Sequence, residues 1–284
     1  MKVLLIGANG QVGHEILCLA PELGVTIDPS DRGRLDLSVP GQAAALISAN
    51  AYDGVLNAAA YTAVDAAEDD AEAAERVNAQ APGEIAAACK AKGIPLVHYS
   101  TDYVFDGTGM RPLVETDPTG PLGVYGCTKL AGEEAVRISG CDHVIIRLAW
   151  VFSAHGRNFV KTMLRLGAER GALSIVADQF GTPTPAADAA HAGLVALAAV
   201  KRNPTLVGTY HFAGAEGTSW AEFAGVIFQE AAMDVAVTPI GTEAYPTRAK
   251  RPAYSVLDSS KFAEAFGIPA ANWRSGLKGV IRKC

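Results

Sequence analysis

A glycine-rich turn near the start of the chain is the feature that most constrains its fold. The turn, Gly7-Ala8-Asn9-Gly10-Gln11-Val12-Gly13, comes directly after the apolar run Val3-Leu4-Leu5-Ile6. Its glycines fit G-x-x-G-x-x-G, a variant of the dinucleotide fingerprint that allows a tight turn and close approach of phosphate to the backbone. A helix that begins near Gln11 would direct its N-terminal amides at a pyrophosphate. We therefore expect a dinucleotide cofactor beside Gly7, Asn9, Gly10, Gln11 and Val12.

The first half of the chain alternates short apolar runs with alanine-rich stretches. The apolar runs predict buried strands at 3–6, 25–27, 54–56, 96–99 and 144–148. The stretches between them predict helices at 11–20, 40–49, 71–92 and 126–139. This alternation predicts an α/β fold, a Rossmann-type doubly wound parallel sheet with helices on both faces. The ligand should lie beyond the carboxyl ends of the strands.

The pattern becomes less regular after about Val151, where glycine and proline interrupt shorter periodic segments. These segments predict helices at 158–170, 186–200, 220–230 and 259–266. We expect a dinucleotide-binding domain over 1–150, to which 186–205 returns. Residues 151–284 should form a smaller substrate-binding lobe that closes over the carboxyl edge of the sheet.

Composition narrows the class of protein. Charged residues make up 19% of the chain and hydrophobic ones 49%, which is typical of a folded globular protein. A net charge of −6 argues against a nucleic-acid partner, because phosphate backbones require a basic face. The five cysteines are scattered and form no Cys-x-x-Cys pair, which indicates reduced thiols. No signal peptide or membrane span is recognisable, so we expect a cytoplasmic protein with no membrane partner.

Charged residues after the second predicted strand bear on the choice of cofactor. Asp28 could bind the ribose hydroxyls of NAD, whereas Arg32 or Arg34 could pair with the 2′-phosphate of NADP. Both kinds of residue are present, so NADH and NADPH both remain open, and we favour NADPH. After the third strand, Asn57-Ala58-Ala59-Ala60-Tyr61 offers small side chains that let a ligand lie directly against the backbone.

Tyr125 and Lys129 are four residues apart on a predicted helix and therefore lie on one face. A tyrosine near its free pKa of ~10 is a poor acid at neutral pH. A neighbouring ammonium would lower that pKa, and the same lysine can bind the nicotinamide ribose. Thr101, at the end of a strand, would offer its hydroxyl to the substrate oxygen. Together these residues predict hydride transfer between a nicotinamide and a carbonyl or alcohol.

The glycine turn, the threonine and the Tyr-x-x-x-Lys pair resemble the extended short-chain dehydrogenase/reductase family. Six further stretches resemble the members of that family that act on a dTDP-linked 4-keto sugar. They are 98–107, 125–133, 147–152, 158–163, 178–184 and 251–258, and the match runs in order from Met1 to about Trp273. The resemblance implies NAD(P)H-dependent reduction of the 4-keto group of dTDP-4-dehydro-6-deoxy-L-mannose to dTDP-L-rhamnose.

The resemblance also implies roles for individual residues. The hydride goes to C4 of the sugar, Tyr125 protonates the developing alkoxide, Lys129 holds the ribose and Thr101 hydrogen-bonds the sugar. Other matching positions fall in two groups: Asp102, Tyr103 and Trp150 line the sugar pocket, while Gly10, Gln11, Val12, Asp36, Leu37 and Ala60 line the cofactor cleft. Asp65 and Glu68 fall in a further family segment near the site.

Three questions stay open at this stage. Some members of the family bridge two subunits through Mg²⁺, and Glu15 matches one acidic position, but Pro185-Ala186-Ala187-Asp188 lacks the family's glutamate. We therefore predict no metal site, and either a monomer or a homodimer. An epimerase or 4,6-dehydratase of the same fold is an alternative activity, and a non-catalytic regulatory or binding protein is another. The six histidines are separate in the sequence, and we assign them no chemistry.

Overall fold

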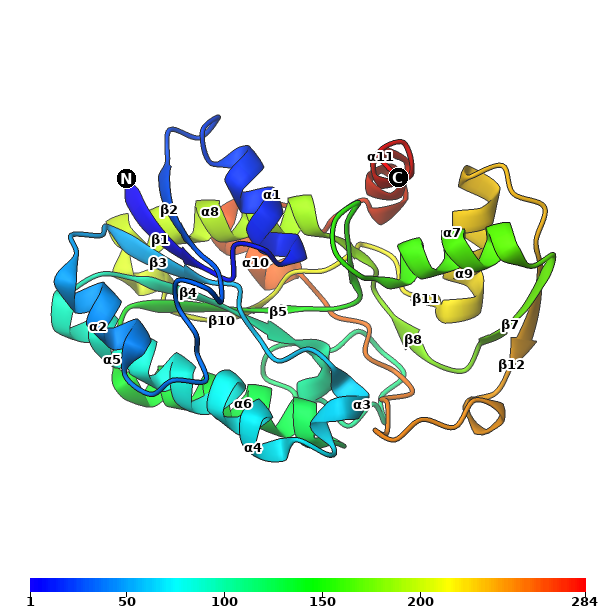
Figure 1. Ribbon diagram of the computed structural model, residues 1–284, viewed down its shortest axis with the longest axis horizontal. Coiled ribbons are helices and arrows are strands. Elements are labelled where there is room, and N and C mark those ends of the chain that lie inside the picture. Colours follow the sequence, from blue (N-terminus) through cyan, green and yellow to red (C-terminus); the bar gives the residue numbers. More distant parts are fainter.

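The computed structural model describes all 284 residues and is built on a central parallel sheet (Figure 1). The six strands have the order β10-β5-β4-β3-β1-β2, and every neighbouring pair is parallel. They are β1 (Lys2–Ile6), β2 (Thr26–Ser30), β3 (Gly54–Asn57), β4 (Leu96–Thr101), β5 (His143–Leu148) and β10 (Gly208–His211). The predicted Rossmann-type α/β fold is confirmed.

The order of the strands reverses at β1. The chain passes from β1 to β2 on one side of it and then crosses to β3 on the other side. In an open α/β sheet, a crevice for ligands forms at such a reversal, beyond the carboxyl ends of the strands. Gly7 follows β1 and Ala58 follows β3, so the predicted cofactor residues flank this crevice.

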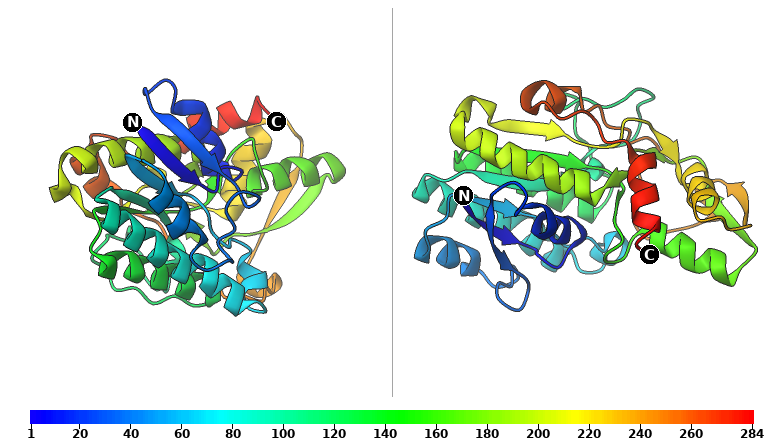
Figure 2. Two further views of the ribbon diagram at one scale, coloured as in Figure 1. Left: turned by 60° about the vertical axis from the view of Figure 1, so that its left-hand side comes forward. Right: turned by 90° about the horizontal axis from the view of Figure 1, so that it is seen from above.

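Helices cover both faces of the sheet, as Figures 1 and 2 show. Adjacent residues of a strand point to opposite faces, so Val3 and Leu5 pack in one apolar cluster and Leu4 and Ile6 in another. Because both faces are covered, the strands read as continuous apolar runs. One face carries α1 (Gln11–Leu19), α8 (Ala186–Arg202) and α10 (Ser260–Phe266); the other carries α2 (Gln42–Ala49), α5 (Ala81–Lys92) and α6 (Val124–Ser139).

The helix predicted at 71–92 is interrupted by a π-helical turn. It consists of α4 (Ala71–Glu75), the π turn η1 (Arg76–Gln80) and α5, and α3 (Val64–Ala67) precedes it. The buried Asn78 of the π turn accepts a hydrogen bond from the Tyr61 amide (2.8 Å) and donates to the Thr128 hydroxyl (3.2 Å). Such turns recur at functional sites, and this one ties the loop after β3 to α6.

The remaining elements form a lobe with an apolar core of its own. That core holds Phe152, Met163, Phe223, Trp273 and Leu277. The lobe contains α7 (Phe159–Glu169), α9 (Trp220–Glu230), α11 (Trp273–Ile281) and three strand pairs: β7 (Ala172–Val176) with β12 (Ala236–Ile240), β6 (Val151–Phe152) with β9 (Thr184–Pro185), and β8 (Phe180–Gly181) with β11 (Thr218–Ser219). Single 3₁₀ turns are η2 (Asp102–Val104), η3 (Pro204–Leu206) and η4 (Thr242–Ala244).

The C-terminal half returns to the sheet twice. Helix α8 packs on α1 and on the central strands, and β10 adds a sixth strand beside β5. These contacts support the proposal that 1–150 and 186–205 form the dinucleotide-binding domain, and they suggest adding β10 and α10 to it. No helix has the length and apolar character that crossing a bilayer requires.

Candidate active site

The glycine turn lies against the loop that follows β3. Gly7 has φ +87°, and a Cβ placed on it would lie 2.6 Å from the Ala59 amide nitrogen. A Cβ on Gly13 would lie 2.2 Å from the Gly7 carbonyl oxygen. No other residue type fits either position without moving the backbone. The close approach brings the N-terminus of α1 and the residues Ala58–Tyr61 together at the crevice.

The two arginines of the loop after β2 both form ion pairs within that loop region. Arg34 holds both carboxylate oxygens of Asp28 and donates to the Pro29 carbonyl at 2.8 Å, and Tyr52 donates to Asp28 at 2.5 Å. The hydrogen bond from Arg34 is the largest influence on the Asp28 carboxyl, and its pKa falls to about 2. The Arg32 side chain is 84% exposed, and its partner is Asp36, 3.3 Å away. Arg34 is therefore engaged by Asp28, while Arg32 is open to a ligand.

The other predicted cofactor residues have varied surroundings. The Asn9 side chain donates from Nδ2 to the Asp31 carboxylate at 3.1 Å, which ties the glycine turn to the loop after β2. The Gln11 side chain accepts a hydrogen bond of 2.8 Å from Asn158 and so joins α1 to the start of α7. Leu37 is buried in the core, so only its backbone can face a ligand.

Helix α6 is held so that Tyr125 lies beside the end of β4. The Glu68 carboxylate accepts a hydrogen bond of 2.8 Å from the Val124 amide at the first turn of the helix. A Cβ on Gly126 would lie 2.2 Å from the Tyr103 carbonyl oxygen, so glycine lets the helix approach this closely. The Tyr125 hydroxyl then lies beside the Thr101 hydroxyl.

The pKa of Tyr125 differs from the expectation that Lys129 lowers it. Burial raises the pKa of Tyr125 to about 12, although the neighbouring Thr101 hydroxyl opposes the shift. The Lys129 ammonium is not among the groups that shift it. Lys129 Nζ donates to the Tyr99 carbonyl at 2.7 Å and lies 3.3 Å from His98 Nε2. Burial lowers the pKa of Lys129 itself to about 8. The prediction that Lys129 acidifies Tyr125 is wrong for this structure, and Tyr125 is a protonated phenol at neutral pH.

Asp102 is buried directly beside the Tyr125 and Thr101 pair. It accepts hydrogen bonds from Ser255 Oγ at 2.5 Å and from Thr101 Oγ1 at 3.1 Å. Burial raises its pKa to about 6, although both hydrogen bonds oppose the shift. The Tyr103 ring lies edge-on to the Tyr125 ring, with centroids 5.5 Å apart. The residues predicted to line the sugar pocket near β4 thus surround the tyrosine.

Trp150 connects the sheet to the lobe. It follows β5 with φ +45°, a conformation that non-glycine residues rarely adopt. Its ring stacks on Trp220, with centroids 3.4 Å apart, and a Cβ on Gly181 would lie 2.4 Å from that ring. Trp220 and Phe159 line a pocket of about 770 Å³ between α7, β7 and the segment around Arg251. The stacking places Trp150 next to this pocket.

Several residues of this region were not predicted as site residues. Arg251 lines the 770 Å³ pocket and donates to the Asp65 carboxylate at 2.7 Å. Trp220 stacks on Trp150, and Ser255 bonds Asp102. In the sequence, the stretch 251–258, which contains Arg251 and Ser255, resembled the family but did not indicate site residues by itself. The sequence around Trp220 does not indicate whether this tryptophan lines a pocket or packs in the core.

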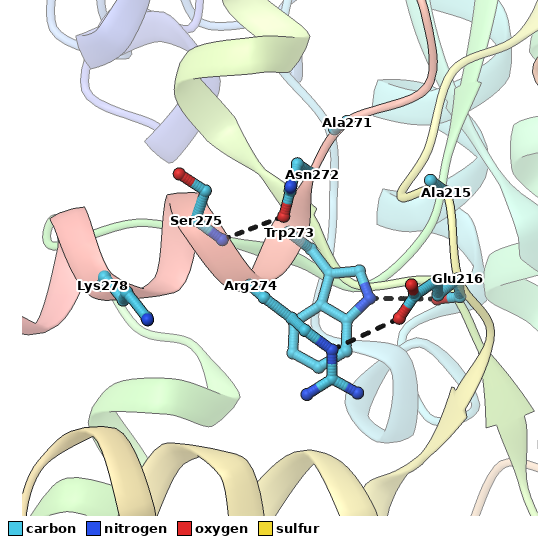
Figure 3. A pocket seen from close by; sticks show the side chains of 8 residues that line it. All are labelled: Ala215, Glu216, Ala271, Asn272, Trp273, Arg274, Ser275 and Lys278. Carbon is cyan, nitrogen blue, oxygen red and sulfur yellow. Dashed lines mark hydrogen bonds and ion pairs between the residues drawn. The ribbon is translucent and has the colours of Figure 1, made fainter.

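A second pocket, of about 350 Å³, opens beside the start of α11 (Figure 3). Arg274 pairs there with Glu216, and the Trp273 indole donates to the Glu216 carbonyl at 3.1 Å. None of the residues predicted for cofactor, substrate or catalysis lines it.

The structure also brings together side chains that the sequence keeps apart. The rings of His14 and His155, which are far apart in the sequence, have their centroids 3.5 Å apart. Glu15, the position that matches a metal ligand in the family, accepts a hydrogen bond from Ser153 at 2.9 Å. The structure contains no group of three or more His, Cys, Asp or Glu side chains arranged for a metal ion.

A Rossmann-type sheet with a glycine turn, a strand-end threonine and Tyr-x-x-x-Lys at one edge defines a nucleotide-dependent oxidoreductase of the short-chain dehydrogenase/reductase class. A family model described as the RmlD substrate binding domain matches residues 1–284. A dTDP-4-dehydrorhamnose reductase of Burkholderia thailandensis is 48% identical, over 99% of this chain and 98% of its own. The chain belongs to the RmlD family of dTDP-4-dehydrorhamnose reductases.

Solved structures of the same family match the whole chain. A crystal structure of a dTDP-4-dehydrorhamnose reductase from Clostridium acetobutylicum has a TM-score of 0.93 and 38% identity, covering 99% of both chains. One from Bacillus anthracis, solved in complex with NADP, has a TM-score of 0.92 and 35% identity and covers 100% of this chain and 99% of its own. The likeness therefore extends over both the sheet and the lobe.

Proposed function

We propose that this chain reduces the 4-keto group of dTDP-4-dehydrorhamnose to give dTDP-L-rhamnose, with NADPH as the preferred cofactor and NADH as the alternative. The observation that carries the proposal is that the Tyr125 phenol lies beside the Thr101 hydroxyl at the end of β4, on the same edge of the sheet as the glycine turn that follows β1. Membership of a reductase family over the full length of the chain supports it.

Tyr125 is suited to act as the acid of this reaction. The phenol keeps its proton at neutral pH, because burial raises its pKa to about 12. A ketone oxygen that becomes an alkoxide is a much stronger base than a phenolate, so proton transfer from Tyr125 is favourable as the charge develops. Thr101 shares that oxygen and fixes its direction. When it is bound, the nicotinamide supplies the hydride.

The residues at the crevice fit a dinucleotide. The glycine turn packs directly on the loop after β3, and the N-terminus of α1, which no side chain caps, offers its amides to a phosphate. Lys129 is assigned to the nicotinamide ribose. Arg32 is the best candidate for a 2′-phosphate, because Arg34 is already paired with Asp28. Because Arg34 balances the charge of the ionised Asp28, this carboxylate repels a 2′-phosphate less than an unpaired one would, which favours NADPH over NADH.

The substrate fits between the sheet and the lobe. We assign the sugar to Asp102, Tyr103 and Trp150, and the nucleotide half to the 770 Å³ pocket beside them. Phe159 and Trp220 in that pocket offer aromatic faces to a base, and Arg251, held by its ion pair with Asp65, lines the same pocket. All five cysteines are free, which is consistent with a cytoplasmic enzyme. We keep the proposal that it acts as a monomer or homodimer.

NADPH absorbance with the 4-keto sugar supplied in situ tests the proposal. A reductase consumes one NADPH for each sugar, whereas an epimerase or a 4,6-dehydratase recycles its cofactor and leaves the absorbance constant. A regulatory protein that has kept the fold would give no turnover, although it would still bind NADPH. Stoichiometric loss of absorbance supports the reductase, and product formed without net loss would overturn it.

A further inference from the structure

Asp65 and Glu68 belong to a segment that the reaction described above does not use. Asp65 lies on the short helix α3, and Glu68 directly follows it, after the loop that ends β3. The two carboxylates have different partners. Asp65 accepts hydrogen bonds from the Ala249 amide at 3.1 Å and from Arg251 at 2.7 Å. Glu68 instead binds the first turn of α6, the helix that carries Tyr125.

The first turn of α6 has no capping side chain of its own. Its N-cap residue is Gly123, which offers no side-chain acceptor. The first four N–H groups of a helix have no partner inside the helix. Glu68 Oε1 accepts from the first of them, the Val124 amide, at 2.8 Å, and a carboxylate is also favoured by the helix dipole at this end. A residue 56 positions earlier in the chain thus caps α6.

The glycine at the N-cap is what lets the carboxylate come so close. A Cβ on Gly123 would lie 2.6 Å from Glu68 Oε1, which is too short for two non-bonded atoms. The backbone itself does not require glycine there, because φ is −148°, an extended value that any residue adopts. The absence of a side chain at this position therefore serves the contact with Glu68.

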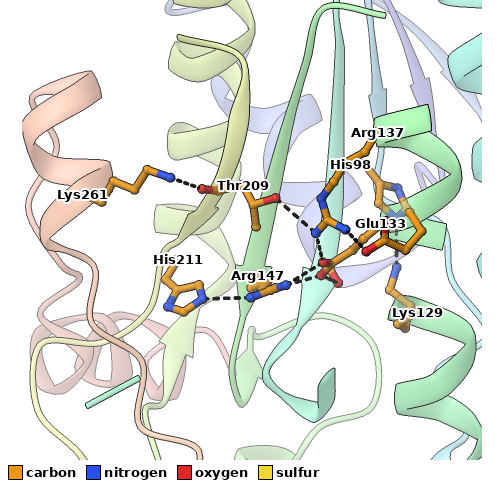
Figure 4. A network of polar contacts seen from close by, with 10 residues as sticks. His98, Lys129, Glu133, Arg137, Arg147, Thr209, His211 and Lys261 are labelled. Atoms are coloured by element: carbon orange, nitrogen blue, oxygen red, sulfur yellow. Dashed lines mark hydrogen bonds and ion pairs between the residues drawn. The ribbon is translucent and has the colours of Figure 1, made fainter. Parts of the chain in front are cut away.

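Further along, α6 is fixed to the sheet by buried polar side chains. Figure 4 shows Glu133 of α6 against Arg147 of β5, with 2.7 Å between the paired atoms. One turn before Glu133, Lys129 Nζ donates to the carbonyl of Tyr99 on β4 at 2.7 Å. Tyr125 precedes both anchors and is the second residue of the helix. Its place therefore depends on how the first turn is held.

We propose that Glu68 is a positioning residue for the proton donor. By capping α6 at Val124, it sets the place of the next residue, Tyr125, beside Thr101. A reacting group that moves by about 1 Å can lose about 10²-fold in rate, so a helix end that shifts slightly slows the reaction. This inference rests on the proposed function, because it concerns the acid of that reaction.

The first test needs no substrate. The Val124 amide has no acceptor within the helix, so its protection against hydrogen exchange depends on Glu68. NMR should show this amide exchanging about tenfold faster in Glu68→Ala than in the parent, the effect of one lost hydrogen bond to a charged group. In Glu68→Gln the amide oxygen still accepts, and protection should largely return. Equal exchange in the parent and in Glu68→Ala would overturn the inference, whatever the enzyme reduces.

The second test separates kcat from KM in turnover of the 4-keto sugar. In Glu68→Ala, kcat should fall by about 10–100-fold, while the KM for the sugar and the Kd for NADPH stay near the parent's. Glu68→Gln should recover most of kcat. The matched control is Glu72→Ala, because Glu72 is an exposed carboxylate in the first turn of α4, and it should leave kcat in place. A folded Glu68→Ala with the parent's kcat, or a Glu68→Gln as slow as Glu68→Ala, would refute the capping role.

A double-mutant cycle with Gly123 gives an independent check. The methyl group of Gly123→Ala would displace the carboxylate, so this variant should lose kcat much as Glu68→Ala does. Once Glu68 is replaced by alanine, the next atom near that methyl is Ala249 Cβ at 3.9 Å, an ordinary contact. The double variant should therefore be about as active as Glu68→Ala alone. Losses that multiply in the double variant would contradict a shared mechanism.

Discussion

The buried carboxylate of Glu133 gives the sharpest test of the packing under the active site. It is fully buried on α6 and accepts four hydrogen bonds: from Ser100 Oγ at 2.6 Å, from Arg137 at 2.5 Å, and from Arg147 at 2.9 and 2.7 Å. The Arg147 side chain is only 3% exposed. Glu133→Gln keeps the shape but leaves that guanidinium with no counter-charge, so we expect a loss of about 3–5 kcal/mol in the free energy of unfolding.

Urea unfolding followed by circular dichroism measures this loss. The matched control is Glu134→Gln, because Glu134 also pairs with Arg137 but is 57% exposed, and its ion pair should contribute no more than about 1 kcal/mol. The folded-state pKa of Glu133 is lowered from 4.5, with the hydrogen bond from Arg147 the main cause opposing burial. Its stabilisation is thus present above pH 4.5 and is lost as the pH falls further, so the two proteins should converge in acid. Equal losses in the two variants would refute the reasoning.

Three further changes have defined outcomes. Arg32→Ala should raise the KM for NADPH about tenfold and leave that for NADH unchanged, because a charged hydrogen bond to the 2′-phosphate is lost; an unchanged ratio removes Arg32 from the cofactor site. Asp102→Asn should gain about 3 kcal/mol in the free energy of unfolding, relative to the parent, as the pH rises from about 4 to 7. The pKa of the parent's carboxyl is raised from 3.8 to about 6 in the folded protein, so its ionisation destabilises the parent in that range. Urea unfolding at several pH values measures the difference between the two proteins, and a difference that does not change with pH would contradict the prediction. Gly132→Ala should lose about 1–3 kcal/mol in thermal unfolding, since its Cβ would lie 2.0 Å from the Asn78 carbonyl oxygen, whereas Gly225→Ala, where the space is open, should not lose stability.

The sequence predicted the sheet because its strands are buried on both faces and therefore stand out as apolar runs. The five strands of the first half and the helices between them were found within a few residues. Strand β10 was missed, because Gly208–His211 is short and polar at its ends. The pair β7 and β12 was missed for a related reason: both strands carry exposed residues, so neither forms a continuous apolar run.

Some features of the site could be predicted from the sequence and others could not. Residues at strand ends and in the Tyr-x-x-x-Lys pair could be predicted, because local spacing determines where they lie. The hydrogen bond from Lys129 to the Tyr99 carbonyl and the stacking of Trp220 on Trp150 depend on partners far away in the sequence, which spacing cannot reveal. The pKa of Tyr125 was predicted in the wrong direction for the same reason. Its shift comes mainly from burial, and the Lys129 amine is drawn to β4 instead.

The central claim is that the Tyr125 phenol gives its proton to the sugar oxygen as hydride reaches the ketone. Turnover of the 4-keto sugar by Tyr125→Phe tests it most directly, with NADPH affinity measured on the same preparation by fluorescence titration. We predict that kcat falls by about 10²–10⁴-fold, the usual contribution of a general acid, while the Kd for NADPH stays unchanged. A variant that binds NADPH normally and retains the parent's kcat would contradict the account.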